Sequence, residues 1–158
     1  MPRGSAPRPP PPAATAQADP DEAALIATLQ GDAGYVEKQE ACRVLRRKGT
    51  PASVPALAAL LFDPQLSHDA RHALEAMPFP EAARALRDAL AGAEGLARAG
   101  IVISIGYRRD PEAVDLLIPL LKDPSPDIAK AAAGALGRIA TPLAVDALFA
   151  SATDASEG

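Results

Sequence analysis

The sequence contains almost no aromatic residues, only 3% of the chain, and no tryptophan. Its hydrophobic content, 48% of 158 residues, therefore consists mostly of Ala, Leu, Val and Ile. This mixture suits closely packed helices, whereas a β-sandwich needs strands rich in aromatic and β-branched residues. The composition favours an all-α domain that is large enough to bury one core.

Cysteine is limited to Cys42, which excludes an intrachain disulfide and a cysteine-based zinc site. No run of about 18 apolar residues occurs, so we expect no membrane span. The net charge of −4 gives no global attraction to nucleic acid or anionic membranes, although a local basic patch is compatible with it. We expect a cytoplasmic protein. A cell-envelope location would require a start further upstream, because the first residues lack the apolar segment of an export signal.

The amino-terminal segment, residues 1–18, differs in composition from the rest of the chain. Seven of the 17 prolines fall within the first 20 residues, which is typical of a disordered or polyproline-like segment. We therefore divide the chain into a Pro/Ala-rich tail at 1–18, a helical repeat domain at 19–150, and a flexible tail at 151–158.

A proline that could open a helix recurs every 29 to 31 residues. Asp or Thr precedes it in four of five cases, which supplies an N-cap oxygen before a residue that has no amide to satisfy. The pairs are Asp19-Pro20, Thr50-Pro51, Phe79-Pro80, Asp110-Pro111 and Thr141-Pro142. We expect these prolines to begin a series of B helices at 20–30, 51–62, 80–91, 111–122 and 142–150.

The segments between the B helices align with one another as well. Leu45, Leu74, Ile105 and Leu136 each lie six residues before a helix-opening proline. Spacings of three and four residues give apolar stripes of helical period. They predict A helices at 36–47, 67–77, 94–107 and 126–139, with Ser67 as the cap of the second.

A lone B helix followed by four A–B pairs predicts an α-solenoid of stacked antiparallel helix pairs, HEAT- or armadillo-like, in which neighbouring units share one core. Leu57, Leu86 and Leu117 occupy matching core positions. The last unit would expose Leu143, Leu148 or Phe149. We therefore expect the carboxyl-terminal repeat to dock on something or to continue in a longer parent protein.

The fourth unit, residues 123–148, reads DPSPDIAKAAAGALGRIATPLAVDAL. It closely resembles the HEAT-like repeats of bacterial proteins, including those named for phycobilisome lyases. The matching positions are Ile128, Ala131, Ala132, Ala133, Ala135, Leu136, Gly137, Ile139, Ala144, Val145 and Leu148. Family members often have arginine where Ala129 stands. The resemblance implies an interaction module, and the lyase name is not carried over because no lyase residue is identifiable.

The histidines and the cysteine could in principle bind a metal or act in catalysis, but a structural role explains each of them better. His68 and His72 share a helix face, but the glutamate of the zinc-enzyme motif is missing, so we predict a solvated polar face and no metal site. Cys42 lies beside the alanine stripe, which favours a buried core residue over a nucleophile. We predict no cofactor and no catalytic activity.

Basic residues recur at the ends of the A helices: Arg46, Arg47, Lys48, Arg108, Arg109 and Arg138. Stacking should place them along one edge as a basic ridge, which could hold an acidic partner or a nucleic-acid backbone. The alternative is that cations at helix carboxyl ends oppose the macrodipole. A second candidate is the B-helix face, with Ser53, Arg84, Arg87, Asp88, Asp115 and Ile118 expected to face solvent.

These observations predict a non-catalytic scaffold that binds another protein. The alternative is a module that binds nucleic acid or another acidic partner through the basic ridge. Nucleic acid is the less favoured partner, because the B-helix face carries mixed charge. The candidate binding residues are Arg47, Arg108, Arg109, Arg138, Arg84 and Arg87.

Overall fold

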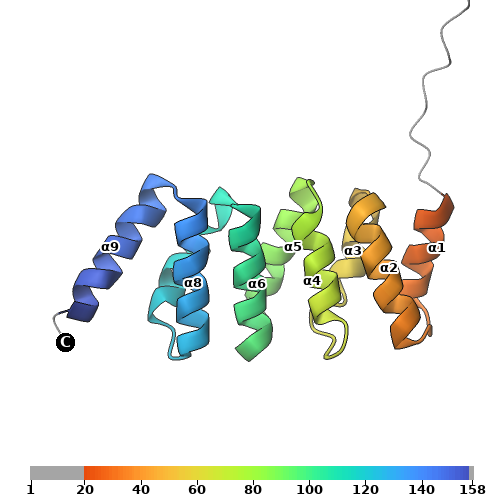
Figure 1. The fold of residues 1–158 in the computed structure, drawn as a ribbon, viewed down its shortest axis with the longest axis horizontal. Coiled ribbons are helices and arrows are strands. Elements are labelled where there is room, and N and C mark those ends of the chain that lie inside the picture. Colours follow the sequence, from red (N-terminus) through yellow and green to blue (C-terminus); the bar gives the residue numbers. More distant parts are fainter. Residues whose placement is uncertain (1–19, 157–158) are drawn as a thin grey trace, which may run out of the picture.

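Two layers of antiparallel helices make up the computed structural model, which describes residues 20–156 (Figure 1). One layer contains the A helices α2 (Tyr35–Lys48), α4 (Ser67–Ala76), α6 (Gly95–Arg108) and α8 (Pro126–Ile139). The other contains the B helices α1 (Pro20–Gln30), α3 (Val54–Ala58), α5 (Pro80–Leu90), α7 (Val114–Leu117) and α9 (Pro142–Ser156). No strand occurs among these residues, and the predicted all-α solenoid is confirmed. The predicted tail at 1–18 lies outside the described residues.

Two B helices are interrupted where the sequence predicts continuous helices. Short 3-10 helices, η1 (Pro51–Ser53), η2 (Pro111–Ala113) and η3 (Ile118–Lys122), flank α3 and α7. Both interrupted segments contain an internal proline, Pro55 or Pro119, which removes a helical hydrogen bond and crowds the preceding turn. The helix α5 has no proline after its first residue and runs unbroken.

Side-chain caps begin several helices as predicted, because a hydroxyl or carboxylate accepts from an amide that has no helical partner. Ala52 N donates to Thr50 Oγ1 at 3.2 Å, Glu112 N donates to Asp110 Oδ1 at 3.2 Å, and Ala144 N donates to Thr141 Oγ1 at 3.3 Å. The predicted Ser67 cap is wrong, since Ser67 is already the first residue of α4. Instead, Asp63 accepts from the amides of Gln65 and Leu66 in the preceding turn, which lowers the pKa of Asp63.

The core follows the predicted register. Leu57, Leu86 and Leu117 are each 0% exposed, and the A-helix residues Leu45, Leu74, Ile105 and Leu136 are also fully buried. Small residues let α6 and α8 pack closely: a Cβ added to Gly106 would lie 2.6 Å from the Cα of Ala135. Stacked units therefore share one continuous core.

Ser53, which was expected to face solvent, is 0% exposed. The carboxylate of Glu22, in the first turn of α1, reaches the start of the next B segment. Its Oε1 accepts from Thr50 N at 2.7 Å, from Thr50 Oγ1 at 3.1 Å and from Ser53 Oγ at 2.9 Å. Glu22 and Ser53 are both buried, and the bond between them satisfies Ser53 Oγ and Glu22 Oε1, whereas Glu22 Oε2 has no hydrogen-bond partner among residues 20–156.

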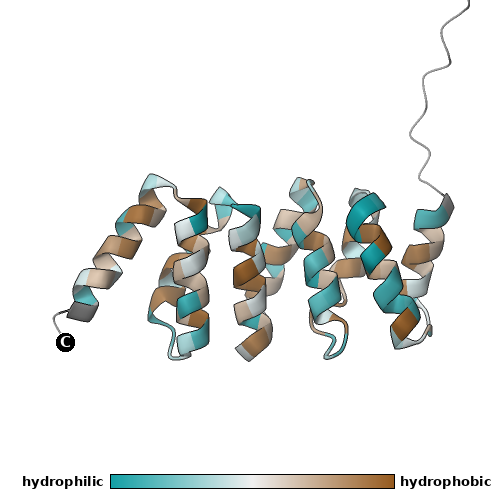
Figure 2. Cartoon of the chain, viewed as in Figure 1, coloured by the Kyte–Doolittle hydropathy of each residue, from teal (hydrophilic) through white to brown (hydrophobic). Residues whose placement is uncertain are grey.

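The last helix, α9, continues to Ser156, beyond the predicted end at residue 150. Residues 151–156 hold no glycine or proline, and Thr153 Oγ1 donates to the oxygens of Phe149 and Ala150. This segment is therefore helical where a flexible tail was expected. Leu143 is 50% and Phe149 71% exposed, as predicted, whereas Leu148 packs partly against the core. Figure 2 shows hydrophobic residues along α9 at this end of the stack.

Candidate functional site

The carboxyl ends of the A helices lie along one edge of the stack, the upper edge in Figure 1. Arg47, at the end of α2, and Arg109, just after α6, are exposed there. Arg109 adopts a left-handed conformation with φ of 52° and acts as the carboxyl-terminal cap residue of α6.

Arg108, the last residue of α6, is half-buried and reaches across to the carboxyl end of α4. Its Nη1 donates to the main-chain oxygens of Leu74 at 2.7 Å, Glu75 at 3.1 Å and Met77, and its Nη2 donates to that of Phe79 at 3.0 Å. These oxygens lie at the carboxyl end of α4 or just after it. The Leu74 oxygen lacks its helical donor, because residue 78 is a proline and has no amide hydrogen, and Arg108 supplies a donor in its place. Burial lowers the pKa of Arg108. Its guanidinium group therefore holds two repeats together, and a ligand would have to displace these bonds to reach it.

Of the two arginines predicted on the B-helix face, Arg84 and Arg87, the first is exposed and the second is ion-paired. Arg84 is exposed and lines a 520 Å³ hollow between α3 and α5, together with Phe62 and Asp88. Arg87 pairs instead with Asp110 at 2.5 Å and with Glu112 at 2.6 Å. The guanidinium group of Arg87 therefore binds both carboxylates at the start of the next B segment.

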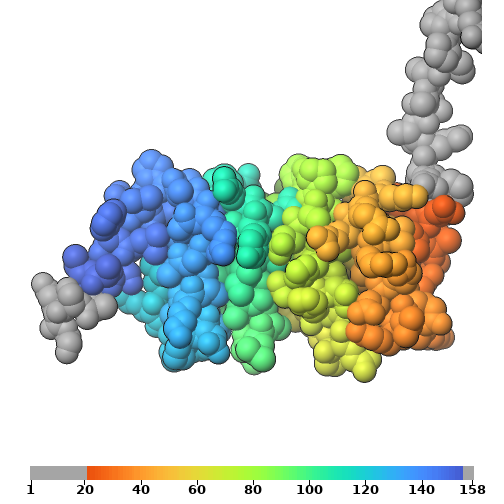
Figure 3. Space-filling model, viewed as in Figure 1, coloured from red at the N-terminus to blue at the C-terminus, as the bar shows by residue number. Residues whose placement is uncertain are grey.

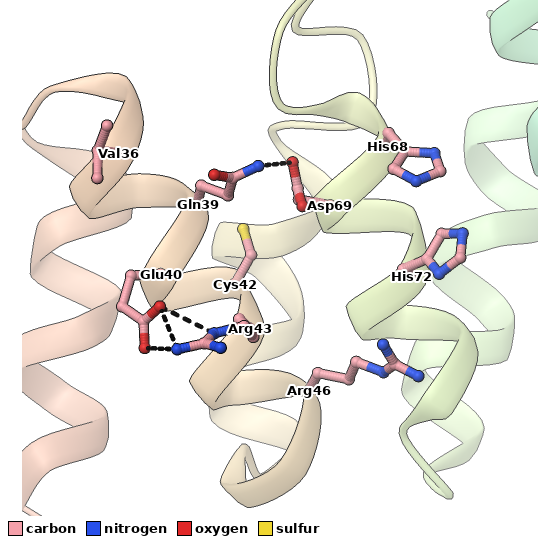
Figure 4. A pocket seen from close by; sticks show the side chains of 9 residues that line it. All are labelled: Val36, Gln39, Glu40, Cys42, Arg43, Arg46, His68, Asp69 and His72. Carbon is pink, nitrogen blue, oxygen red and sulfur yellow. Dashed lines mark hydrogen bonds and ion pairs between the residues drawn. The ribbon is translucent and has the colours of Figure 1, made fainter.

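A cleft of 610 Å³ separates α2 from α4 and contains the side chains singled out for chemistry (Figure 4). Cys42 is 1% exposed, and burial, followed by the charge of Asp69, raises the pKa of its thiol to about 11. The thiol is therefore protonated at neutral pH and is a poor nucleophile. Arg43 is paired with Glu40 at 2.8 Å.

The two histidines project from α4 on the side turned away from Glu40 (Figure 4). Their ring centroids are 4.3 Å apart, and Arg71 Nη2 lies 3.1 Å from His68 Nδ1, which must accept because arginine can only donate. Burial, and then the neighbouring His68, lowers the pKa of His72. Residues 20–156 contain no cluster of three or more His, Cys, Asp or Glu side chains that could hold a metal ion.

A larger groove, of 750 Å³, runs over α6 and α8 on the A-helix face, the face turned to the viewer in Figure 3. Its floor contains the small residues Ala99, Gly100, Ala131 and Gly134. We call it the α6–α8 groove and define it by these residues with Arg71, Leu96, Ile103, Tyr107, Asp127, Lys130 and Arg138. Leu96 is 81% exposed, Tyr107 57% and Ile103 37%. Large apolar side chains thus surround a shallow floor.

Arg138, near the carboxyl end of α8, also lies along this groove. Its guanidinium carbon is 4.5 Å from the centre of the Tyr107 ring, and its Nη1 donates to the Gly134 oxygen at 3.2 Å. A cation over an aromatic face is attracted by the ring quadrupole. Tyr107 and Arg138 thereby link α6 to α8 at one end of the groove.

Arg71 enters the groove from α4 and passes beside Gly100, where an added Cβ would lie 2.9 Å from Arg71 Nε. Its Nη1 donates to Ser104 Oγ at 3.0 Å, and Ser104 in turn donates to Glu75 Oε2 at 2.7 Å. Burial lowers the pKa of Arg71. Gly100 is therefore required for this position of the arginine.

The sequence interpretation missed Leu96, Ile103 and Arg71. A signal was present: Leu96 and Ile103 are large apolar residues in a helix whose core stripe is already filled by Ile101 and Ile105. Apolar side chains outside the stripe indicate a second packing surface.

Paired helices stacked around one core define an α-solenoid of the helical-repeat class. Residues 83–158 match a family model described as HEAT repeats. No curated protein matches the sequence. None of the helices between residues 20 and 156 has the length and apolarity to cross a membrane. HEAT repeats generally mediate protein–protein interaction and are typically non-catalytic.

Proposed function

We propose that this chain is a non-catalytic scaffold that binds another protein through the A-helix face, mainly through the α6–α8 groove. The exposed side chains of Leu96, Ile103 and Tyr107 around a floor of small residues carry the proposal. Large apolar groups gathered on one face typify protein-binding surfaces, because burying them against a partner is favourable. We further propose a cytoplasmic location and a kinship with the bacterial HEAT-like repeats that the fourth unit resembles.

The alternative of a nucleic-acid module along the basic ridge has less support. Arg108 donates to four main-chain oxygens and is therefore not available to a phosphate. Arg46, Arg47, Lys48 and Arg109 remain exposed at that edge. They do not form a continuous basic track, because Glu75, Ala76 and Met77 occupy the matching positions at the end of α4.

The proposal is tested by affinity capture from the source cells at low and at high salt, with Ile103→Asp as the disruptive variant. Leu116→Asp is the matched control, since Leu116 is an exposed aliphatic residue, 46% accessible, on the B-helix side. We expect a protein that the wild type and the control retain at high salt and that Ile103→Asp loses. Equal recovery by both variants would place the binding surface elsewhere, and recovery of nucleic acid only at low salt would favour the basic ridge.

A further inference from the structure

The charge around the α6–α8 groove is opposite in sign to that of the whole chain. Three cations, Arg71, Lys130 and Arg138, line the groove beside a single carboxylate, Asp127, whereas the chain carries a net charge of −4. None of the ion pairs between residues 20 and 156 involves Lys130 or Arg138. The groove is therefore a local basic surface in an acidic protein.

From this juxtaposition we propose that the α6–α8 groove binds an acidic peptide segment that carries apolar side chains. The inference rests on the proposed protein-binding function and specifies its partner by chemistry. Carboxylates of the segment would face Lys130 and Arg138, while its apolar side chains would cover Leu96 and Ile103.

The floor of the groove favours a peptide that approaches with its backbone or with a helix face. Gly100 and Gly134 have no side chain, and Ala99 and Ala131 have only a methyl group. Small residues allow close contact between main chains, as between α6 and α8 themselves at Gly106.

Two of the three cations, Arg71 and Arg138, are positioned by contacts within the chain. Arg71 is held by Ser104 and by the space at Gly100, and Arg138 is held by Tyr107 and the Gly134 oxygen. Side chains that are already ordered lose less conformational entropy on binding. Glu75, which accepts from Ser104, offsets part of the Arg71 charge, so Lys130 and Arg138 are the main partners for a carboxylate.

A peptide is favoured over nucleic acid by the exposed aliphatic groups. Leu96 and Ile103 offer nothing to phosphates, and Tyr107 already has Arg138 over its ring. Binding to single strands typically uses free aromatic faces along a continuous basic track.

The test is fluorescence anisotropy of the full chain with a labelled acidic peptide in which leucine recurs at helical spacing and the other positions are Glu or Asp. The comparison probes are the same peptide with Lys in place of the acids, the acidic peptide with Ser in place of Leu, and a single-stranded RNA. The disruptive variant is Lys130→Glu/Arg138→Glu, and the matched control is Arg47→Glu/Arg84→Glu, which reverses two exposed cations outside the groove. Far-UV circular dichroism and thermal melting verify that both variants fold.

We expect the acidic leucine peptide to bind most tightly, and its Kd to rise about tenfold or more in the groove variant but less than about twofold in the control. Equal binding of the Lys peptide, an unchanged Kd in the groove variant, or no binding of any peptide overturns the inference. Peptide binding that Phe62→Asp abolishes while the groove variant retains it also overturns the inference and leaves the proposed protein-binding function standing, with the α3–α5 hollow as its site. RNA binding that displaces the peptide overturns both.

Discussion

Replacing Arg108 by methionine keeps the apolar stem of the side chain and removes every guanidinium donor. Four main-chain oxygens at the end of α4 then lose a charged partner: those of Leu74, Glu75, Met77 and Phe79. A hydrogen bond from a charged donor contributes about 1.5–3 kcal/mol, but the four contributions do not add in full, because water reaches this half-buried position. We expect Arg108→Met to lower the free energy of unfolding by about 2–4 kcal/mol.

The adjacent residue provides the control. Arg109 is exposed, and Arg109→Ala should change the free energy of unfolding by less than about 0.5 kcal/mol. Urea denaturation followed by far-UV circular dichroism measures both variants. Equal stability of Arg108→Met and the wild type would refute the assignment of Arg108 as the group that closes α4. A binding assay that replaces both arginines together would confuse lost binding with lost folding.

Leu117 is 0% exposed, so Leu117→Ala should lower the free energy of unfolding by about 2–5 kcal/mol; a change near zero in urea denaturation would mean that the repeat register is wrong. Gly106→Ala should cost about 1–3 kcal/mol because the new Cβ would collide with Ala135. Gly137→Ala, where nothing lies within 4 Å of an added Cβ, should instead raise the melting temperature, and destabilisation by both substitutions would contradict the close α6–α8 contact. The pKa of His72 is lowered from 6.5, so the unfolded chain binds this proton first and stability falls as the pH drops through about 6.5. His72→Gln should flatten this slope between about pH 7.5 and about pH 5.5, and an unchanged slope would assign it to other groups.

Much of the helix pattern could be read from the sequence, because the signals are local. The cap oxygens of Thr50, Asp110 and Thr141 precede prolines, and each contacts an amide two or three residues further along the chain. The interruptions of the B segments that contain α3 and α7 could have been predicted from Pro55 and Pro119. The apolar stripe continues through both prolines, however, and therefore predicted unbroken helices.

The candidate site was harder to predict. Arg108 and Arg109 are adjacent and chemically identical, yet one closes α4 and the other faces solvent. Ser53 was expected at the surface and is buried against Glu22, which lies 31 residues earlier in the chain. The contact of Arg138 with the Tyr107 ring was also not visible in the sequence. Each of these outcomes depends on a partner in a neighbouring repeat.

The sequence by itself determined the helices, their order, the repeat length and the residues of the shared core, since helical period, caps and prolines act over a few residues. Only the tertiary structure decided which polar groups meet across repeats and where the α6–α8 groove lies. The physical reason is that the same side chain can make its hydrogen bonds either with water or with a group of the neighbouring repeat. The choice depends on the distance and angle at which the units stack, and at Gly106 that distance is set by contact with Ala135.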